Sequence, residues 1–203
     1  MTTGVILLAG GKARRFGADK RIARLPDGQW LIMAAIENIA RSGLPLLVCL
    51  GADDAGLQRA LRAGGIACIK CADSHLGMGS TLAEGIAAID RSWRGVLVAL
   101  ADMPLIRPET YARVRDKLAA GKIVVPVHAG RRGHPVGFDH TYFPGLLALR
   151  GDRGARAILT AHPDSVLALE VDDPGVLADV DRPHDLQALF RPRCPKRRSD
   201  QAP

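Results

Sequence analysis

Short apolar segments alternate along the chain with longer stretches in which apolar residues recur at helical spacing. The apolar segments predict strands at residues 4–9, 45–51, 66–70, 95–102 and 122–127. The stretches between them predict helices at residues 30–43, 54–65, 80–93 and 108–121. Strands that are apolar throughout and separated by helices are typical of a parallel sheet covered on both faces. The pattern therefore predicts an α/β fold with a doubly wound, mostly parallel sheet.

The regular alternation of predicted strands and helices ends after residue 127. Residues 131–138, "RRGHPVGF", predict an exposed extended segment that leans over the sheet as a substrate-facing flap. Later segments predict two short helices, a strand and a last helix, at residues 142–149, 152–162, 165–171 and 182–190. We expect residues 1–190 to form one domain.

Composition agrees with an ordinary globular domain. The 203 residues are 47% hydrophobic and 24% charged, and only 4% are aromatic, so the core must be built from aliphatic side chains. No apolar run approaches the roughly 18 residues that span a bilayer, and the first residues do not resemble a signal peptide. The sequence therefore predicts a cytoplasmic protein without a membrane partner.

The net charge of +7 is concentrated at the end of the chain. Residues 191–203, "RPRCPKRRSDQAP", contain five basic residues against one acidic residue, together with three prolines. Such a composition predicts a basic, disordered and solvated tail. A nucleic-acid partner is the weaker interpretation, because the rest of the chain is only mildly basic.

Cys68 and Cys71 have the CxxC spacing of some metal and redox sites. The chain has no second CxxC to complete a zinc site. In a strand, residues three apart point to opposite faces, whereas a redox CxxC places its first cysteine at a helix N-terminus. We therefore expect buried thiols without metal or redox function.

The first predicted strand is followed by the segment "LAGGKARRFGADKR", residues 8–21. In open α/β sheets ligands bind beyond the carboxyl ends of the strands. The segment fits neither the Walker A spacing nor the dinucleotide GxGxxG spacing. What remains is a tight turn that exposes the backbone N–H groups of Gly10 and Gly11. The cations that follow, Arg14, Arg15, Lys20 and Arg21, suit a nucleoside triphosphate better than a single phosphate.

Acidic residues near other strand ends predict a magnesium site. Asp102 ends the segment "VALADMP", and a carboxylate beside a phosphate loop is a natural ligand for Mg²⁺. In "ADVDRP", Asp179 and Asp181 would lie on one face of an extended segment and offer a second carboxylate ligand, although Asp181 could also cap the following helix. In "HLGMGSTLAEG", Thr81 and Glu84 predict a capping box, and the glycines before them, with Ser80, are candidate ligand contacts.

Three further residues are candidates for holding an anionic substrate. His134 lies in the predicted flap, and Arg153 and Arg156 flank glycines in "GDRGAR". A structural histidine and a solvated turn are the alternative interpretations of these segments.

Six segments in order resemble the MobA/MocA-like nucleotidyltransferase family, which includes the molybdenum cofactor cytidylyltransferases. They are "LAGGKARRFGADK", "GMGSTLAEGI", "LADMP", "RRGHPVGF", "GDRGAR" and "DVDRPHDL". The resemblance implies a Rossmann-like NTP-transferase fold over residues 1–190. It also implies that a terminal phosphate of the acceptor, such as molybdopterin, attacks the α-phosphorus of a nucleoside triphosphate and releases pyrophosphate.

The resemblance assigns roles to particular positions. Arg15, Lys20 and Asp102 are expected to be catalytic, and Asp102 with Asp181 is expected to hold Mg²⁺. His134, Arg153 and Arg156 are expected to bind the acceptor. The nucleotide is expected to contact Leu8, Ala9, Gly10, Gly11, Arg15, Lys20, Gly79 and Ser80.

The choice of base stays open between CTP and GTP. The glycine turn is closer to the guanylyltransferase branch, whereas "GMGSTLAEG", "GHPVGF" and "GDRGAR" are similar to the cytidylyltransferase branch, so CTP is favoured. Another phosphorylated acceptor is a further alternative. A non-catalytic carrier that delivers the cofactor to a molybdoenzyme or its maturation factor would keep the glycine turn but would not need Asp102.

Overall fold

One eight-stranded sheet forms the centre of the molecule. The computed structural model describes residues 2–11, 16 and 19–189, so Arg15 and the predicted tail at 191–203 lie outside the described residues. The strands are β1 (Thr2–Ala9), β2 (Leu46–Gly51), β3 (Cys68–Cys71), β4 (Trp93–Leu100), β5 (Ile123–His128), β6 (Arg131–Arg132), β7 (Val136–Asp139) and β8 (Val166–Glu170).

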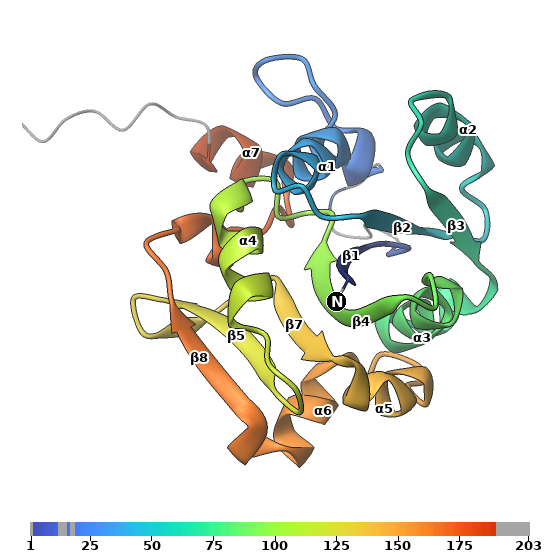
Figure 1. Ribbon diagram of the computed structural model, residues 1–203. Coiled ribbons are helices and arrows are strands. Elements are labelled where there is room, and N and C mark those ends of the chain that lie inside the picture. The colour runs from blue at the N-terminus through green and yellow to red at the C-terminus, as the bar shows by residue number, and fades with distance from the viewer. Residues whose placement is uncertain (1, 12–15, 17–18, 190–203) are drawn as a thin grey trace, which may run out of the picture.

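Helices cover both faces of this sheet, as Figure 1 shows. The α-helices are α1 (Leu31–Arg41), α2 (Ala55–Ala63), α3 (Met78–Ala88), α4 (Pro108–Lys117), α5 (Phe143–Leu147), α6 (Arg156–Ala161) and α7 (Pro183–Leu189). Buried side chains of α1, α2 and α4 belong to one hydrophobic cluster, and those of α3 and α5 belong to a second cluster, against which α6 also packs. The two clusters lie on opposite faces of the sheet, and the predicted α/β architecture is confirmed.

The order of the strands is β3-β2-β1-β4-β7-β5-β6, and β8 also pairs with β5. β1 is parallel to β2 and β4, β2 to β3, and β5 to β8. Leu8 of β1 lies opposite Leu100 of β4, and Gly10 and Asp102 each come two residues after this pair. The register therefore brings these two positions to one edge of the sheet.

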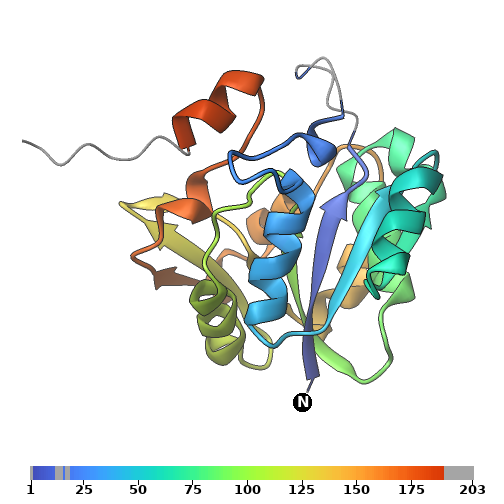
Figure 2. The same ribbon diagram turned by 90° about the horizontal axis from the view of Figure 1, so that it is seen from above.

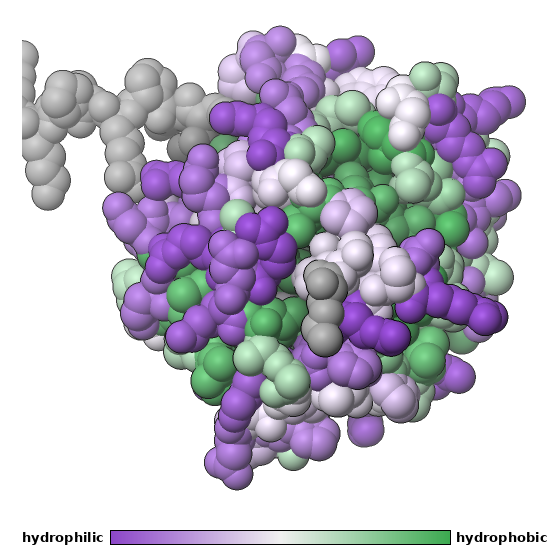
Figure 3. Space-filling model, in the orientation of Figure 1, coloured by the Kyte–Doolittle hydropathy of each residue, from purple (hydrophilic) through white to green (hydrophobic). Residues whose placement is uncertain are grey.

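That edge is seen at the upper end of β1 in Figure 2, where α7 and the short helix η1 (Lys20–Ile22) lie nearby. Figure 3 looks instead from the end at which β1 begins, where hydrophilic residues surround a more hydrophobic middle. The segments that carry the candidate site are thus at the end of the molecule away from the viewer in Figures 1 and 3.

Each helix packs because its apolar residues recur on one side. In α1 the side chains of Ile32, Ile36 and Ile39 follow the i, i+4, i+7 pattern and are buried against the sheet. Burying an isoleucine side chain contributes about 1.5–3 kcal/mol, so this face is sufficient to fix the helix on β1 and its neighbours.

The segment 131–138 is exposed and extended, as predicted, only at its start, where Arg131–Arg132 form β6. Its second half forms β7, which is buried and runs antiparallel between β4 and β5. Phe138 has no exposed surface and pairs with both Val96 and Ile123. The prediction failed because this strand is short and is stabilised by pairing with distant strands, which local pattern does not reveal.

The predicted capping box at Thr81 is also wrong. α3 begins at Met78, three residues earlier, and Thr81 donates its hydroxyl hydrogen to the carbonyl of Gly77. Glu84 accepts hydrogen bonds from the backbone N–H groups of Ala72 and Asp73 at 2.8 and 2.7 Å. The glutamate therefore caps the turn before α3 instead of α3 itself.

The cysteines of the CxxC segment point to opposite faces of β3, as predicted. Cys68 lies in one hydrophobic cluster, whereas Cys71 lies in the other beside Cys49. A hydrogen bond with Cys71 and burial raise the pKa of Cys49 well above its usual value, so this thiol stays protonated. Among the described residues, no helix is long and apolar enough to cross a membrane.

Candidate active site

Lys20 joins two acidic residues at the carboxyl edge of the sheet. Its ammonium group lies 2.6 Å from Oδ2 of Asp102 and 3.3 Å from Oδ1 of Asp181. It also donates to the carbonyl of Val180 at 2.9 Å. Three segments that are far apart in the sequence therefore meet at one cationic group, and the structure brings together three of the residues that the sequence singled out.

The polypeptide fixes each of these side chains. Asp102 follows β4, and its carbonyl accepts a hydrogen bond from the N–H of Val180 at 2.9 Å, which holds the segment before α7 against it. The N–H groups of Asp181 and Arg182 donate to Asp185, which leaves the Asp181 carboxylate directed at Lys20. Asp185, and not Asp181, thus satisfies the backbone at the start of α7.

The two carboxylates are suited to holding a divalent cation. They converge on the point that the Lys20 ammonium now occupies, and Oδ1 of Asp102 is buried without a hydrogen-bond partner among the described residues. A buried carboxylate oxygen that accepts no hydrogen bond is stabilised when a cation or a hydrogen-bond donor binds to it. The residues present therefore fit a hard cation such as Mg²⁺ or Mn²⁺.

No group of three or more acidic, histidine or cysteine side chains that could hold a metal occurs within residues 2–11, 16 and 19–189. Two protein carboxylates leave the remaining positions of an octahedral ion to water or phosphate oxygens, which is the usual arrangement for Mg²⁺. The site is thus better suited to a metal that arrives with phosphates than to a permanently bound one.

Lys20 is held in its charged form. Its partial burial lowers the pKa, but the hydrogen bonds and negative charges of Asp102 and Asp181 outweigh this effect and raise the pKa above its usual value. The lysine is therefore a permanent positive charge at neutral pH and can neutralise phosphate oxygens.

The glycine turn lies beside this group of charges. Leu8 and Ala9 are buried at the end of β1, and Gly10 packs closely against the segments that precede and begin α3. A Cβ atom at Gly10 would lie 3.2 Å from Ser74 and Thr81, whereas no atom of the described residues lies within 4 Å of a Cβ at Gly11. The turn therefore requires a small residue at position 10 and leaves the backbone of Gly11 accessible.

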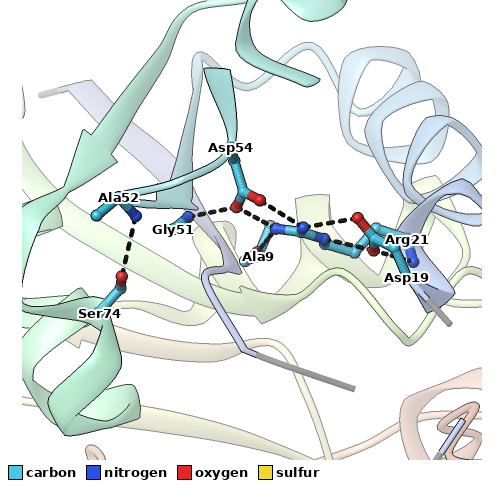
Figure 4. A network of polar contacts seen from close by, with 7 residues as sticks. All are labelled: Ala9, Asp19, Arg21, Gly51, Ala52, Asp54 and Ser74. Atoms are coloured by element: carbon cyan, nitrogen blue, oxygen red, sulfur yellow. Dashed lines mark hydrogen bonds and ion pairs between the residues drawn. The ribbon is translucent and has the colours of Figure 1, made fainter. Parts of the chain in front are cut away.

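Arg21 has a different set of partners from Lys20. Figure 4 shows its guanidinium between Asp19 and Asp54, and one of its N–H groups donates to the carbonyl of Ala9 at 2.6 Å. The expectation that Arg21 supplies charge to phosphates is wrong, since Asp19, Asp54 and the carbonyl of Ala9 accept all of its side-chain N–H groups. Sequence reasoning missed this network; the available signal was an acidic residue, Asp54, in the short loop after β2.

Gly79 and Ser80 are engaged with the loop that precedes α6. The N–H of Gly79 donates to the carbonyl of Gly151 at 2.8 Å, and the Ser80 hydroxyl accepts from the N–H of Gly151 at 3.0 Å. A Cβ at Gly79 would lie 2.3 Å from the carbonyl oxygen of Arg153. These two residues thus fix the loop at 151–153, and their part in nucleotide binding stays a prediction.

A cavity of about 810 Å³ opens beside the strand ends. Its floor is apolar and comes from β1, β4, β5, β7, β8 and α3, while Arg132, His134, Asp152 and Arg156 add polar groups. His134 and Arg156, predicted to bind substrate, therefore line one cavity. Arg153 is not among its lining residues, and Arg132 and Asp152 were not singled out from the sequence.

His134 is held neutral by its surroundings. Burial lowers its pKa below the usual value of 6.5, although a hydrogen bond to the carbonyl of Val98 and the charges of Asp102 and Asp179 oppose the shift. Among the described residues, Lys20, Asp102 and Asp181 do not line the cavity, and His134 connects it to them through the electrostatic influence of Asp102.

Comparison with known proteins gives a family match over most of the chain. The model of the family described as "MobA-like NTP transferase domain" matches residues 5–166. Purine catabolism protein PucB of Bacillus subtilis is 28% identical over 123 residues, which are 60% of this chain and 60% of PucB. The chain thus spans less than two thirds of the length of this curated relative.

Solved structures are similar over nearly the whole chain. Rv0371c of Mycobacterium tuberculosis is 27% identical with a TM-score of 0.76, and the match covers 93% of this chain and 97% of that one. Another structure of Rv0371c is a complex with manganese, with a TM-score of 0.74. Molybdopterin-guanine dinucleotide biosynthesis protein A of Archaeoglobus fulgidus shares the fold, with 20% identity, a TM-score of 0.65, and coverage of 91% of this chain and 95% of that one.

Proposed function

Since the chain belongs to the MobA-like NTP transferase family, we propose that it transfers a nucleoside monophosphate from CTP to the terminal phosphate of a molybdopterin-type acceptor. The observation that carries this proposal is the convergence of Lys20, Asp102 and Asp181 beside a cavity large enough for a second substrate. Mg²⁺ is the proposed cofactor.

The proposed reaction is a single displacement at phosphorus. An oxygen of the acceptor's terminal phosphate forms a bond to the α-phosphorus, and the bond from that phosphorus to the bridging oxygen breaks. Pyrophosphate leaves with the electron pair of the broken bond. Such a reaction needs alignment and charge neutralisation, and no nucleophilic side chain of the protein is required.

Different residues of the chain are proposed to align the substrates and to neutralise their charge. The open backbone at Gly11 allows phosphate oxygens to approach closely, and Lys20 supplies a positive charge next to them. Asp102 and Asp181 would hold Mg²⁺, which when bound neutralises phosphate charge and makes the α-phosphorus more electrophilic.

The cavity is the proposed acceptor site. Its apolar floor suits a heterocyclic ring system, while His134 and Arg156 can orient an anionic group near Asp102. Because His134 is neutral, it acts as a hydrogen-bond partner and not as a charge. The Archaeoglobus fulgidus protein, whose name refers to molybdopterin-guanine dinucleotide, supports the choice of a molybdopterin-type acceptor.

The nucleotide preference can be tested by thermal stabilisation. A ligand that binds only the native state raises the melting temperature, by an amount that grows with its concentration relative to Kd. With Mg²⁺ present, CTP is expected to raise the melting temperature more than GTP does. A larger shift with GTP would assign the protein to guanylyl transfer.

The catalytic assignment is tested by replacing Asp102. Pyrophosphate release is measured with CTP, Mg²⁺ and molybdopterin for the wild type, for Asp102→Asn and for the control Asp116→Asn. Asp116 is exposed and contacts only Arg115 among the partners that the structure gives it. Loss of release in Asp102→Asn alone supports the proposal, whereas unchanged release in that variant would refute it.

A further inference from the structure

The side chain of Arg21 is a junction between three parts of the chain. Its Nη2 donates to Oδ1 of Asp54 at 2.6 Å, and its Nε donates to Oδ1 of Asp19 at 2.8 Å. Nη1 donates to the carbonyl oxygen of Ala9 at 2.6 Å. The guanidinium thereby joins the end of β1, the segment after β2 and the start of η1, as Figure 4 shows.

All of the donors of this guanidinium are used. Arginine has five N–H groups, and Arg21 makes five side-chain hydrogen bonds: one from Nε, two from Nη1 and two from Nη2. Its side chain is only 11% exposed. Arg21 consequently has no donor left for a phosphate group and can influence ligand binding only through the residues that it holds.

Asp54 anchors the junction to the sheet. Besides the contact with Arg21, its carboxylate accepts a hydrogen bond from the N–H of Gly51 at 2.6 Å. Gly51 is the last residue of β2, and a Cβ there would lie 2.8 Å from the same carboxylate. The aspartate is thus fixed against the strand that neighbours β1.

Burial of the guanidinium opposes its charged form, but Asp19 and Asp54 outweigh this effect and raise the pKa of Arg21. The positive charge is therefore permanent. Because a buried charge is stable only with its partners in place, each member of the network holds the others in position.

We propose that Arg21, anchored by Asp54, is a positioning residue. It holds the glycine turn and Lys20 at the relative positions in which both can contact a nucleoside triphosphate. Ala9 directly precedes Gly10, and Lys20 directly precedes Arg21, so one guanidinium fixes the backbone on both sides of the phosphate-binding segment. The inference rests on the proposed function, because it concerns the affinity of that same site for its nucleotide.

Preorganisation is the physical reason for the expected effect. A binding segment whose ends are already fixed loses less conformational entropy when the ligand binds. Without the guanidinium, the backbone of Ala9 and the segment that begins at Asp19 lose this direct link, and Lys20 keeps its contacts with Asp102, Val180 and Asp181. The free energy needed to order Gly10 and Lys20 relative to each other then lowers the affinity for the nucleotide.

The experiment measures binding by isothermal titration calorimetry, with CTP, GTP and inorganic tripolyphosphate as probes, each with Mg²⁺. The variant is Arg21→Met, and the matched control is Arg24→Met. Arg24 lies three residues later, donates to the carbonyl of Gly28 and stacks on Trp30, away from the network. Arg21→Met is expected to weaken binding at least tenfold, whereas the control changes it less than twofold.

The three probes locate the effect. Because the network touches the backbone beside the predicted phosphate-binding segment, the loss is expected to be similar for tripolyphosphate and for the nucleotide that the wild type binds. A loss for the nucleotide without a loss for tripolyphosphate would overturn the assignment to phosphate positioning.

Loss of folding is separated from loss of positioning by the same titration. Unfolded molecules lower the number of binding sites per chain, but they do not change the Kd of the folded molecules. If Arg21→Met lowers the site number or the melting temperature and leaves Kd unchanged, Arg21 is only structural and the inference is wrong, while the proposed function stands. If the wild type binds none of the probes, the proposed function fails and this inference fails with it.

Asp54→Asn provides a milder second variant should Arg21→Met not fold. Its amide keeps the size of the side chain but removes the charge that anchors the guanidinium. We expect weaker nucleotide binding than in the wild type, and little further loss on combining it with Arg21→Lys, because both changes disrupt one unit. Fully additive losses would show that the two residues do not act together.

Discussion

Lys20 occupies the position at which the two acidic residues of the site converge. Its ammonium lies within 3.3 Å of both Asp102 and Asp181, so the protein's own cation neutralises the carboxylates. A metal ion bound by the same oxygens has to displace this contact, and Lys20 is then available to phosphate oxygens. Metal binding and triphosphate binding are thereby expected to favour each other.

Lys20→Met tests this exchange of cations. Without the ammonium, the affinity for Mn²⁺ in the absence of nucleotide is expected to rise severalfold, since nothing has to be displaced. The affinity for a nucleoside triphosphate with Mg²⁺ is expected to fall. Free Mn²⁺ is measured by electron paramagnetic resonance, with Lys70→Met, an exposed residue of β3, as the control. Equal or weaker Mn²⁺ binding in Lys20→Met would contradict the exchange.

Residues at strand ends could be found from the sequence, but their partners could not. Asp102 and Lys20 stood out because apolar strands locate the carboxyl edge of the sheet. The pairing of Arg21 with Asp54 joins residues 33 positions apart and depends on β1 lying beside β2. The local sequence pattern does not indicate such a contact, so the sequence predicts that Arg21 supplies charge to phosphates.

At the level of elements, α3 and the loop at 151–153 form a rigid pair. Gly79 lets the helix approach this loop so closely that its N–H reaches the carbonyl of Gly151. The sequence located the helix, but it did not predict that the helix begins at Met78, because the capping glutamate binds a different turn. The elements built from local pattern were predicted well, whereas β7 and the start of α3 depend on distant partners.

Gly79→Ala is expected to destabilise the protein. Alanine is favoured over glycine in a helix by up to about 1 kcal/mol, but here the added methyl group meets a backbone oxygen at 2.3 Å. Overpacking of this kind typically costs about 1–3 kcal/mol, so the net free energy of unfolding should fall.

Gly56→Ala is the matched control for this substitution. Gly56 lies in α2, and no atom of residues 2–11, 16 and 19–189 lies within 4 Å of its added methyl group. It is expected to raise the free energy of unfolding by about 0.4–1 kcal/mol. Urea unfolding of both variants checks the pair; destabilisation by Gly56→Ala equal to that of Gly79→Ala would contradict the close-contact explanation.

For the molecule as a whole, stability depends on pH through a buried neutral histidine. The pKa of His134 is lower in the folded protein than its usual value of 6.5, mainly because of burial. As the pH falls below 6.5, the unfolded chain takes up a proton at this position that the folded chain does not. The contribution of His134 to the free energy of unfolding is therefore fully present above pH 6.5, and it is lost as the pH falls toward the lowered pKa.

His134→Gln should remove this contribution. One differential proton corresponds to at most about 1.4 kcal/mol of stability per pH unit. Urea unfolding from pH 7.5 to 5 is expected to show a smaller decline in the variant than in the wild type. Asp19 and Asp139 have lowered pKa values and act only at more acidic pH, near and below 3.8, so they do not obscure this range. Parallel declines in both proteins would contradict the assignment to His134.

Nucleotidyl transfer itself is tested most directly by following the α-phosphate. The protein is incubated with molybdopterin, Mg²⁺ and CTP labelled at the α-phosphorus, and the products are separated. The proposed function predicts that the label appears in a molybdopterin dinucleotide and that unlabelled pyrophosphate is formed in equal amount. Label that remains in CTP, or that appears only as free CMP, would contradict it.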